Sequence, residues 1–203
     1  MLAFPCALDV LFERAELIGP ERPHVVEPGL QGDERLRTQA VDVNARVVLD
    51  PLLLDQAAGP EHPQVAVQVG VGNYTIKGTF VLQKPSGHTN YYGLIFGGSD
   101  LDNAKQSYTY FLVAQDGTFL IKKREGEATS DVVKKTPNDA VKKPGADGKS
   151  TNALEVRVGA DKIDYVVNGT VVSSSPKAGT KTDGLVGIRV NHLLEVHIDG
   201  FSK

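Results

Sequence analysis

The sharpest chemical pattern in the sequence is Glu195-Val196-His197-Ile198-Asp199, close to the C-terminal end. Successive side chains of a β-strand point to opposite faces, so a strand here places Glu195, His197 and Asp199 together on one face. Glycoside hydrolysis needs two carboxyl groups that flank the scissile bond, one as acid and one as nucleophile or base. These three residues are therefore the candidate catalytic residues. The alternative is the water-exposed outer face of a final strand.

The densest group of aromatic residues lies in two neighbouring segments and comprises Tyr91, Tyr92, Tyr108 and Tyr110. A tyrosine on the exposed side of a sheet can stack on a sugar ring while its hydroxyl group forms hydrogen bonds. His88 and Asn90 precede the first pair and are placed to form the rim of the same groove. All six are candidate ligand-binding residues, and the alternative is that the rings fill the core.

A third candidate follows Gly97-Gly98 and consists of Ser99, Asp100, Asp102 and Asn103. Oxygen ligands at alternate loop positions are what Ca²⁺ recruits, but the ion needs six or more of them. This stretch offers three or four, so we expect no cofactor and no metal site, with calcium as the weak alternative. The alternative is an ordinary turn capped by Asp and Asn.

The elements that must position these residues have the two-residue period of β-strands. In 73–83, Tyr74, Ile76, Phe80 and Leu82 fall on one face, whereas 91–97 is apolar on both faces, as expected of a central strand. Asp-Gly between 108–114 and 118–124, and Asn-Gly after 163–167, predict hairpins. Segments 154–158, 185–190 and 193–198 complete the strands, and 125–151 is expected to be a surface loop. We predict an all-β antiparallel sandwich.

Composition excludes several classes of function. The 203 residues carry a net charge of −3, so the protein has no excess of positive charge with which to attract the phosphate backbone of a nucleic acid. No apolar run is long enough to span a bilayer. The single cysteine, Cys6, rules out a disulfide or a thiolate zinc site within the chain. The motifs GxxxxGK[ST], HExxH and GxSxG are absent. The sequence therefore gives no motif-based support for nucleotide hydrolysis, zinc-dependent proteolysis or acyl transfer. Neither nucleic acid nor a membrane is an expected partner, and the oligomeric state stays open.

Residues 1–64 differ in composition from residues 65–203. They contain no Lys, Tyr or Ser but seven of the eleven Pro residues, and their net charge is −6 against +3 for the remainder. We interpret 1–64 as an atypical segment that is disordered or arises from a misassigned start, and 65–203 as the folded domain. The opening MLAFPCALDVLF lacks a basic leading region and a cleavage site, so it is not a recognisable signal peptide.

Five runs carry a resemblance to a known group: NYTIKGTF, KPSGHTNYYGLIFGGSDL, YTYFLVAQDGTFLIKKREG, NALEVRVGADKIDYVVNGTVV and GLVGIRVNHLLEVHIDGF. Together they resemble bacterial concanavalin A-like lectin/glucanase domains, close to the 3-keto-disaccharide hydrolase type, over residues 70–203. The resemblance implies a two-sheet antiparallel jelly-roll β-sandwich and a secreted or periplasmic location. The family 16 glycoside hydrolases have a similar alternation of Glu, Asp and Glu, from which His197 and Asp199 depart.

The resemblance implies a carbohydrate-associated domain that binds a glycan on one sheet face. One alternative is a glycoside hydrolase or keto-sugar-cleaving enzyme that uses Glu195, His197 or Asp199 as acid and base. The other is a non-catalytic structural or protein-interaction module of an exported assembly.

Overall fold

The computed structural model describes residues 46–49 and 64–203, and this part of the chain is built from β-strands. In chain order the strands are β1 (Arg46–Leu49), β2 (Gln64–Gly70), β3 (Tyr74–Lys84), β4 (Tyr91–Ser99), β5 (Ser107–Ala114), β6 (Thr118–Glu125), β7 (Ala128–Pro137), β8 (Ser150–Val158), β9 (Lys162–Val167), β10 (Thr170–Pro176), β11 (Gly184–Val190) and β12 (Glu195–Ser202). Among these residues there is no helix with the length and apolarity needed to cross a membrane.

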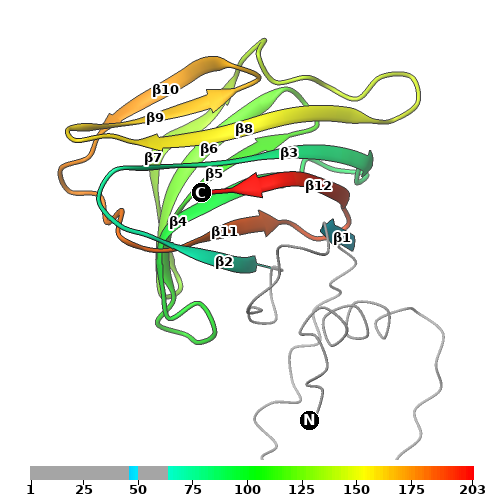
Figure 1. Cartoon of the computed structure of the whole chain (residues 1–203). Helices are drawn as coiled ribbons and strands as arrows, with labels where there is room; N and C mark the ends of the chain where they lie inside the picture. Colours follow the sequence, from blue (N-terminus) through cyan, green and yellow to red (C-terminus); the bar gives the residue numbers. More distant parts are fainter. Residues whose placement is uncertain (1–45, 50–63) are drawn as a thin grey trace, which may run out of the picture.

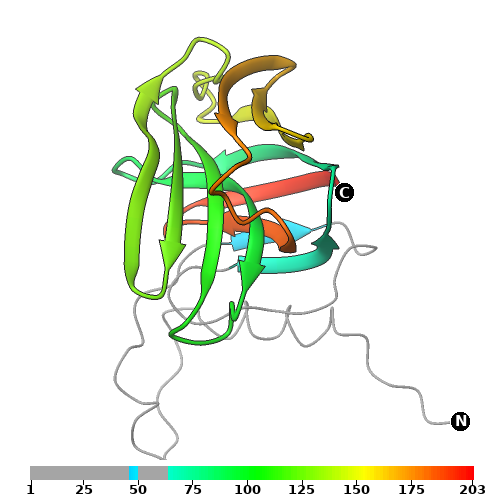
Figure 2. The same cartoon turned by 90° about the vertical axis from the view of Figure 1, so that its left-hand side faces the viewer.

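The strands form two six-stranded sheets that face each other (Figures 1 and 2). Sheet A has the order β1-β12-β3-β8-β9-β10, and sheet B has the order β2-β11-β4-β5-β6-β7. Neighbouring strands are antiparallel throughout, except that β1 runs parallel to β12. The predicted all-β, two-sheet jelly-roll sandwich is therefore confirmed, with one parallel pair that the sequence did not indicate.

Alternating burial explains why these segments are strands. In β3, Tyr74, Ile76, Phe80 and Leu82 are buried while Lys77 is exposed, as the two-residue period predicts. β4 lies between β11 and β5 and is buried on both faces from Tyr92 to Gly98, which agrees with its continuous apolar sequence. Both predicted hairpins are present, with Gly117 and Asn168 at positive φ in the turns.

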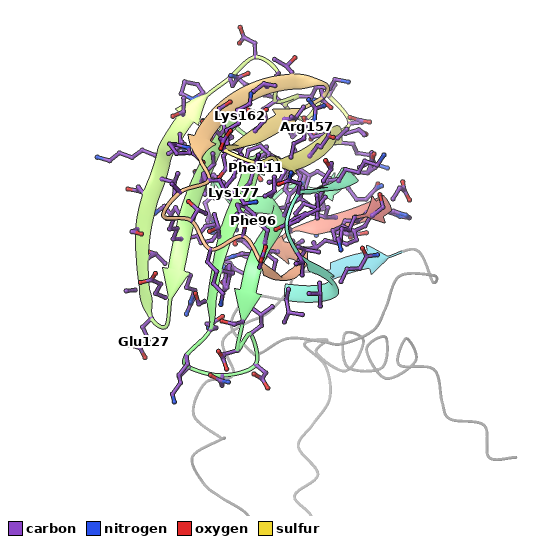
Figure 3. The ribbon with its side chains drawn as sticks, turned by 60° about the vertical axis from the view of Figure 1, so that its left-hand side comes forward. Phe96, Phe111, Glu127, Arg157, Lys162 and Lys177 are labelled. Atoms are coloured by element: carbon purple, nitrogen blue, oxygen red, sulfur yellow. The ribbon has the colours of Figure 1, made fainter. Side chains whose placement is uncertain are left out.

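The core lies between the sheets and is rich in aromatic rings. Phe96 on β4 and Phe111 on β5 are fully buried there, and Figure 3 labels both within the interior. Phe111 packs against Phe119 and Tyr165 with ring centroids 6.2 and 5.4 Å apart in edge-to-face arrangements. Such edge-to-face contacts stabilise the fold by more than the burial of their apolar surface alone. Because Phe111 and Tyr165 lie on different sheets, their contact helps to fix how the two sheets face each other.

The prediction of a surface loop over 125–151 is wrong in its first half, because β7 occupies Ala128–Pro137. β7 is an edge strand of sheet B, and its side chains are exposed or partly exposed. Only Val132 and Val133 pack against the core. An edge strand in which most side chains are exposed to water has little apolar alternation, so its sequence resembles a polar loop.

The last strand also begins later than predicted, at Glu195 rather than Leu193. Leu193 has a φ of 59°, in the left-handed region that a β-strand does not use. The residue therefore belongs to the turn between β11 and β12.

Of the atypical segment 1–64, only Arg46–Leu49 and Gln64 are among the described residues. All four residues of β1 pair with Glu195–Ile198 of β12. Because β12 also pairs with β3 on its other side, it is an interior strand of sheet A. The remainder of the predicted disordered or misassigned segment lies outside the described residues.

Candidate functional site

An arginine and two tyrosines form a cluster on the outer face of sheet B. On β11, Ile188 and Val190 enter the core, so the intervening Arg189 points outward. Its Nη1 donates a hydrogen bond of 2.9 Å to the Tyr108 hydroxyl. Its Cζ atom lies 4.7 Å from the centroid of the Tyr110 ring, within the range of a cation–π contact. We call Arg189, Tyr108 and Tyr110 the arginine cluster.

The arginine cluster is deeply set. Arg189 is 7% exposed, and its Nε has no hydrogen-bond partner among the described residues. No carboxylate of the described chain lies within 4.0 Å of the guanidinium group, although burial of a charge without an opposite charge is costly. The guanidinium group therefore has donors, and a charge, with which to bind an anionic group.

Apolar and basic side chains surround this cluster on the same face. The apolar part consists of Ile95, Leu101, Leu112 and Leu120, with Tyr91 and Leu185 packed against it. Burial raises the pKa of Tyr110, whereas Arg189, Lys122 and Arg124 act in the opposite direction. Lys122 is paired with Asp131 at 3.2 Å, and Arg124 Nε donates to the Gly126 carbonyl oxygen. The surroundings of Tyr110 are thus dominated by positive charge.

Of the four candidate tyrosines, the structure brings three to this outer face and places one elsewhere. Tyr91 packs against the apolar part, and Tyr108 and Tyr110 belong to the arginine cluster. Tyr92 lies in the core between the sheets, where it is fully buried and burial raises its pKa. Its hydroxyl accepts a hydrogen bond of 3.2 Å from Asn152 Nδ2. Tyr92 therefore has no surface with which to meet a ligand.

His88 and Asn90 lie in the β3–β4 loop beside His192 of the β11–β12 turn. The Nε2 atoms of the two histidines are 3.3 Å apart. Asn90, which is 4% exposed, donates from Nδ2 to the His192 carbonyl oxygen at 2.8 Å. The structure thus joins these two predicted residues to a third that the sequence analysis did not select.

Glu195, His197 and Asp199 lie on the outer face of sheet A. Val196 and Ile198 of the same strand enter the core, so the three polar side chains point away from it. His197 Nε2 is 2.9 Å from Asp199 Oδ1. The candidate catalytic residues therefore share a face, as the strand period predicts, but that face is opposite to the one that carries the arginine cluster.

Asp100, Asp102 and Asn103 form a turn after β4. Asp100 has a φ of 54°, and its carbonyl oxygen accepts a hydrogen bond from the Asn103 backbone N–H. Asn103 Oδ1 accepts from the Lys105 N–H at 2.8 Å, and Asn103 Nδ2 donates to Asp102. The Asp102 and Asn103 side chains thus make hydrogen bonds within the turn. Among the described residues no group of three His, Cys, Asp or Glu is arranged to hold a metal ion.

Sequence reasoning missed Arg189 and His192. A signal for Arg189 was available, because a single arginine between Ile188 and Val190 in an apolar strand must either break the core or occupy the opposite face. His192 gave no comparable signal, since only the fold brings it beside His88, 104 positions away in the chain.

The sequence matches no protein-family profile and no curated protein significantly. Solved structures of similar shape include sheep galectin-11 in complex with glycerol, at 13% identity over 69% of this chain and 97% of that one (TM-score 0.42). The carbohydrate-binding module CBM66 from Bacillus subtilis matches at 14% identity over 70% and 83% (TM-score 0.43). The catalytic domain of an endo-1,3-β-glucanase from Thermotoga petrophila matches at 12% identity over 64% and 58% (TM-score 0.40).

Proposed function

We propose that this protein binds a saccharide that carries an acidic group, on the outer face of sheet B. The observation that carries the proposal is the buried Arg189 guanidinium, which lacks a carboxylate partner in the described part of the chain. Of its five N–H donors, one is used by the Tyr108 hydroxyl. A ligand carboxylate or sulfate supplies the negative charge and the acceptor oxygens that the site lacks.

Tyr108 and Tyr110 act mainly by holding the guanidinium group. They are 2% and 5% exposed, so their rings offer little surface to a sugar. The Tyr108 hydroxyl and the Tyr110 ring fix the guanidinium from two sides, which lowers the entropy that binding must remove. Tyr91 and Lys122 are only partly buried and are the side chains available at the rim. Lys122 lies opposite Tyr110 on the neighbouring strand β6 and adds a second positive charge beside the cluster.

The test compares acidic with neutral saccharides in a binding assay on immobilised glycans, followed by calorimetry. We expect uronic acid- or sulfate-bearing glycans to bind and neutral β-glucans to bind weakly or not at all. Arg189→Met should lower the affinity for the acidic glycan by roughly ten- to a hundredfold, the value of one charge-assisted contact. Arg157→Met is the matched control, because Arg157 lies in sheet A, where it pairs with Glu155.

Equal binding of neutral and acidic glycans, or an unchanged affinity in Arg189→Met, would contradict the proposal. The same glycans also test catalysis. Hydrolysis that disappears in Glu195→Gln but persists in Arg189→Met would assign function to the outer face of β12 instead.

A further inference from the structure

Two surface loops meet at the end of the sandwich and bring two imidazole rings together. His88 belongs to the loop between β3 and β4, and His192 belongs to the turn between β11 and β12. Their Nε2 atoms are 3.3 Å apart, and the ring centroids are 5.4 Å apart with the planes tilted by 43°. Both nitrogens therefore point at the same small region.

From this arrangement we propose that His88 and His192 form a binding site for Zn²⁺ or a related transition-metal ion. A zinc ion binds imidazole nitrogen at about 2.0–2.1 Å in tetrahedral geometry, which separates two such nitrogens by about 3.3–3.4 Å. The observed separation of 3.3 Å is that of two ligands on one tetrahedral ion.

A hydrogen bond between the rings is the competing account of this contact, with the Nε2–H of one ring donating to the Nε2 lone pair of the other. Asn90 Nδ2 lies 3.2 Å from both His88 Nε2 and Ser86 Oγ. The Asn90 amide cannot turn its oxygen toward the histidine, because Nδ2 faces the His192 carbonyl oxygen at 2.8 Å. A cation between the rings uses the Nε2 lone pair of each.

The loops are held in place without any contribution from an ion. Gln115 Nε2 donates to the carbonyl oxygens of Ser86 and His88 at 2.8 and 3.1 Å, which fixes the first loop. Asn90 binds the second loop through the His192 carbonyl oxygen. Leu193 adopts a φ of 59° directly after His192, a conformation that a non-glycine residue adopts at a cost. The two ligands are therefore positioned in advance of binding.

Two residues that adjoin the histidine pair each carry a buried side-chain oxygen that is open to donation from water. Gln115 Oε1 and Asn191 Oδ1 have no hydrogen-bond partner among the described residues. Gln115 Nε2 donates a hydrogen bond to the His88 carbonyl oxygen, and Asn191 directly precedes His192 in the chain. Water molecules that complete the coordination of a metal ion have O–H groups to donate to such oxygens.

The ligand type selects the ion. Neutral imidazole suits Zn²⁺, Cu²⁺ and Ni²⁺, whereas Ca²⁺ and Mg²⁺ require oxygen ligands. No third His, Cys, Asp or Glu joins the pair in the part of the chain that the structure describes. Water therefore fills the other positions, and the affinity is expected to be lower than that of a three- or four-ligand site.

The full chain is titrated with ZnCl₂ by calorimetry, with Co²⁺ absorption as a second readout of tetrahedral coordination. We expect one ion per chain and an affinity at least about tenfold lower in both His88→Ala and His192→Ala, because each removes one of two protein ligands. His197→Ala is the matched control, since His197 pairs with Asp199 on the outer face of sheet A. A combined His24→Ala, His62→Ala variant controls for the two remaining histidines of the chain.

The melting temperature of each variant is recorded with and without Zn²⁺. A ligand that binds only the folded state raises the melting temperature, and this rise should disappear in His88→Ala and His192→Ala. If the histidine pair is merely a link between two loops, the variants will lower the melting temperature without metal while the Zn²⁺ response stays unchanged. That result, or no Zn²⁺ binding by the original chain, or equal binding of Mg²⁺, would overturn the proposal.

Discussion

Replacing Asn152 by alanine tests the buried polar network that ties the β7–β8 connection to the core. Asn152 lies on β8 and is 0% exposed. Its Oδ1 accepts hydrogen bonds from the Lys142 backbone N–H at 2.8 Å and from Asn168 Nδ2 at 2.9 Å. Its Nδ2 donates to the Tyr92 hydroxyl at 3.2 Å and to the Lys142 carbonyl oxygen at 3.1 Å. Every hydrogen-bonding position of the amide group is thus occupied.

The expected loss follows from what alanine leaves behind. Each hydrogen bond contributes about 1 kcal/mol net, and a buried group left without a partner costs about 1–3 kcal/mol. Within the described part of the chain the Lys142 N–H keeps no other acceptor, whereas Asn168 Nδ2 still donates to the Ala140 carbonyl oxygen at 2.7 Å. We therefore expect Asn152→Ala to lower the free energy of unfolding by about 3–5 kcal/mol, or on the order of 10 °C in Tm.

Urea unfolding followed by circular dichroism measures this loss, and an unchanged m value shows that the folded and unfolded states remain comparable. Asn103→Ala is the control, because Asn103 lies in an exposed turn where water replaces its hydrogen bonds. A loss below about 1 kcal/mol for Asn152→Ala would refute the reasoning, since it would mean that the network contributes no more than an exposed amide.

Two further predictions concern the core and the response to pH. Phe111→Ala should lower the free energy of unfolding by about 3–5 kcal/mol because the ring is fully buried, whereas Leu193→Ala, at 38% exposure, should lower it by less than about 1 kcal/mol. Equal losses for the two variants in urea unfolding would contradict the assigned core. Burial opposes ionisation of Asp116, but hydrogen bonds from Lys135 and Thr118 outweigh it and lower the pKa of this carboxyl group. A lowered folded-state pKa stabilises the protein above the unfolded value of about 3.9, and this contribution is lost as the pH falls through the folded value. The stability difference between the original chain and Asp116→Asn should therefore shrink below about pH 4, and a difference that is constant from pH 7 to pH 3 would count against it.

The all-β fold was predictable because burial and strand period agree along most of the chain. In β3 and β8 every second side chain is buried, so the alternation of apolar and polar residues in the sequence predicts a strand there. The Asp-Gly and Asn-Gly turns fixed the hairpin partners. β7 was missed because an exposed edge strand carries no such alternation. The parallel pairing of β1 with β12 joins segments almost 150 residues apart, and no local pattern encodes it.

The candidate site was harder to predict than the fold. The tyrosines were selected as a group, but strand alternation separates them: Tyr92 enters the core while Tyr91 faces outward beside it. The same alternation places Glu195, His197 and Asp199 on one face, yet it does not say which of the two sheets that face belongs to. Contacts such as Arg189 with Tyr108, or His88 with His192, depend on strand order, which composition and period leave undetermined.

Both proposed sites depend on the register of β11. Arg189 points outward from this strand, and His192 follows two residues after its end. The pairing of β11 shifts around Val186 and Gly187 against both neighbours, as a β-bulge does. A slip of one residue would turn Arg189 into the apolar core and move Ile188 and Val190 to the outer face. The guanidinium group would then lose its contacts with Tyr108 and Tyr110. The arginine that makes the outer face suitable for an acidic ligand therefore also helps to exclude the wrong register of the strand that carries it.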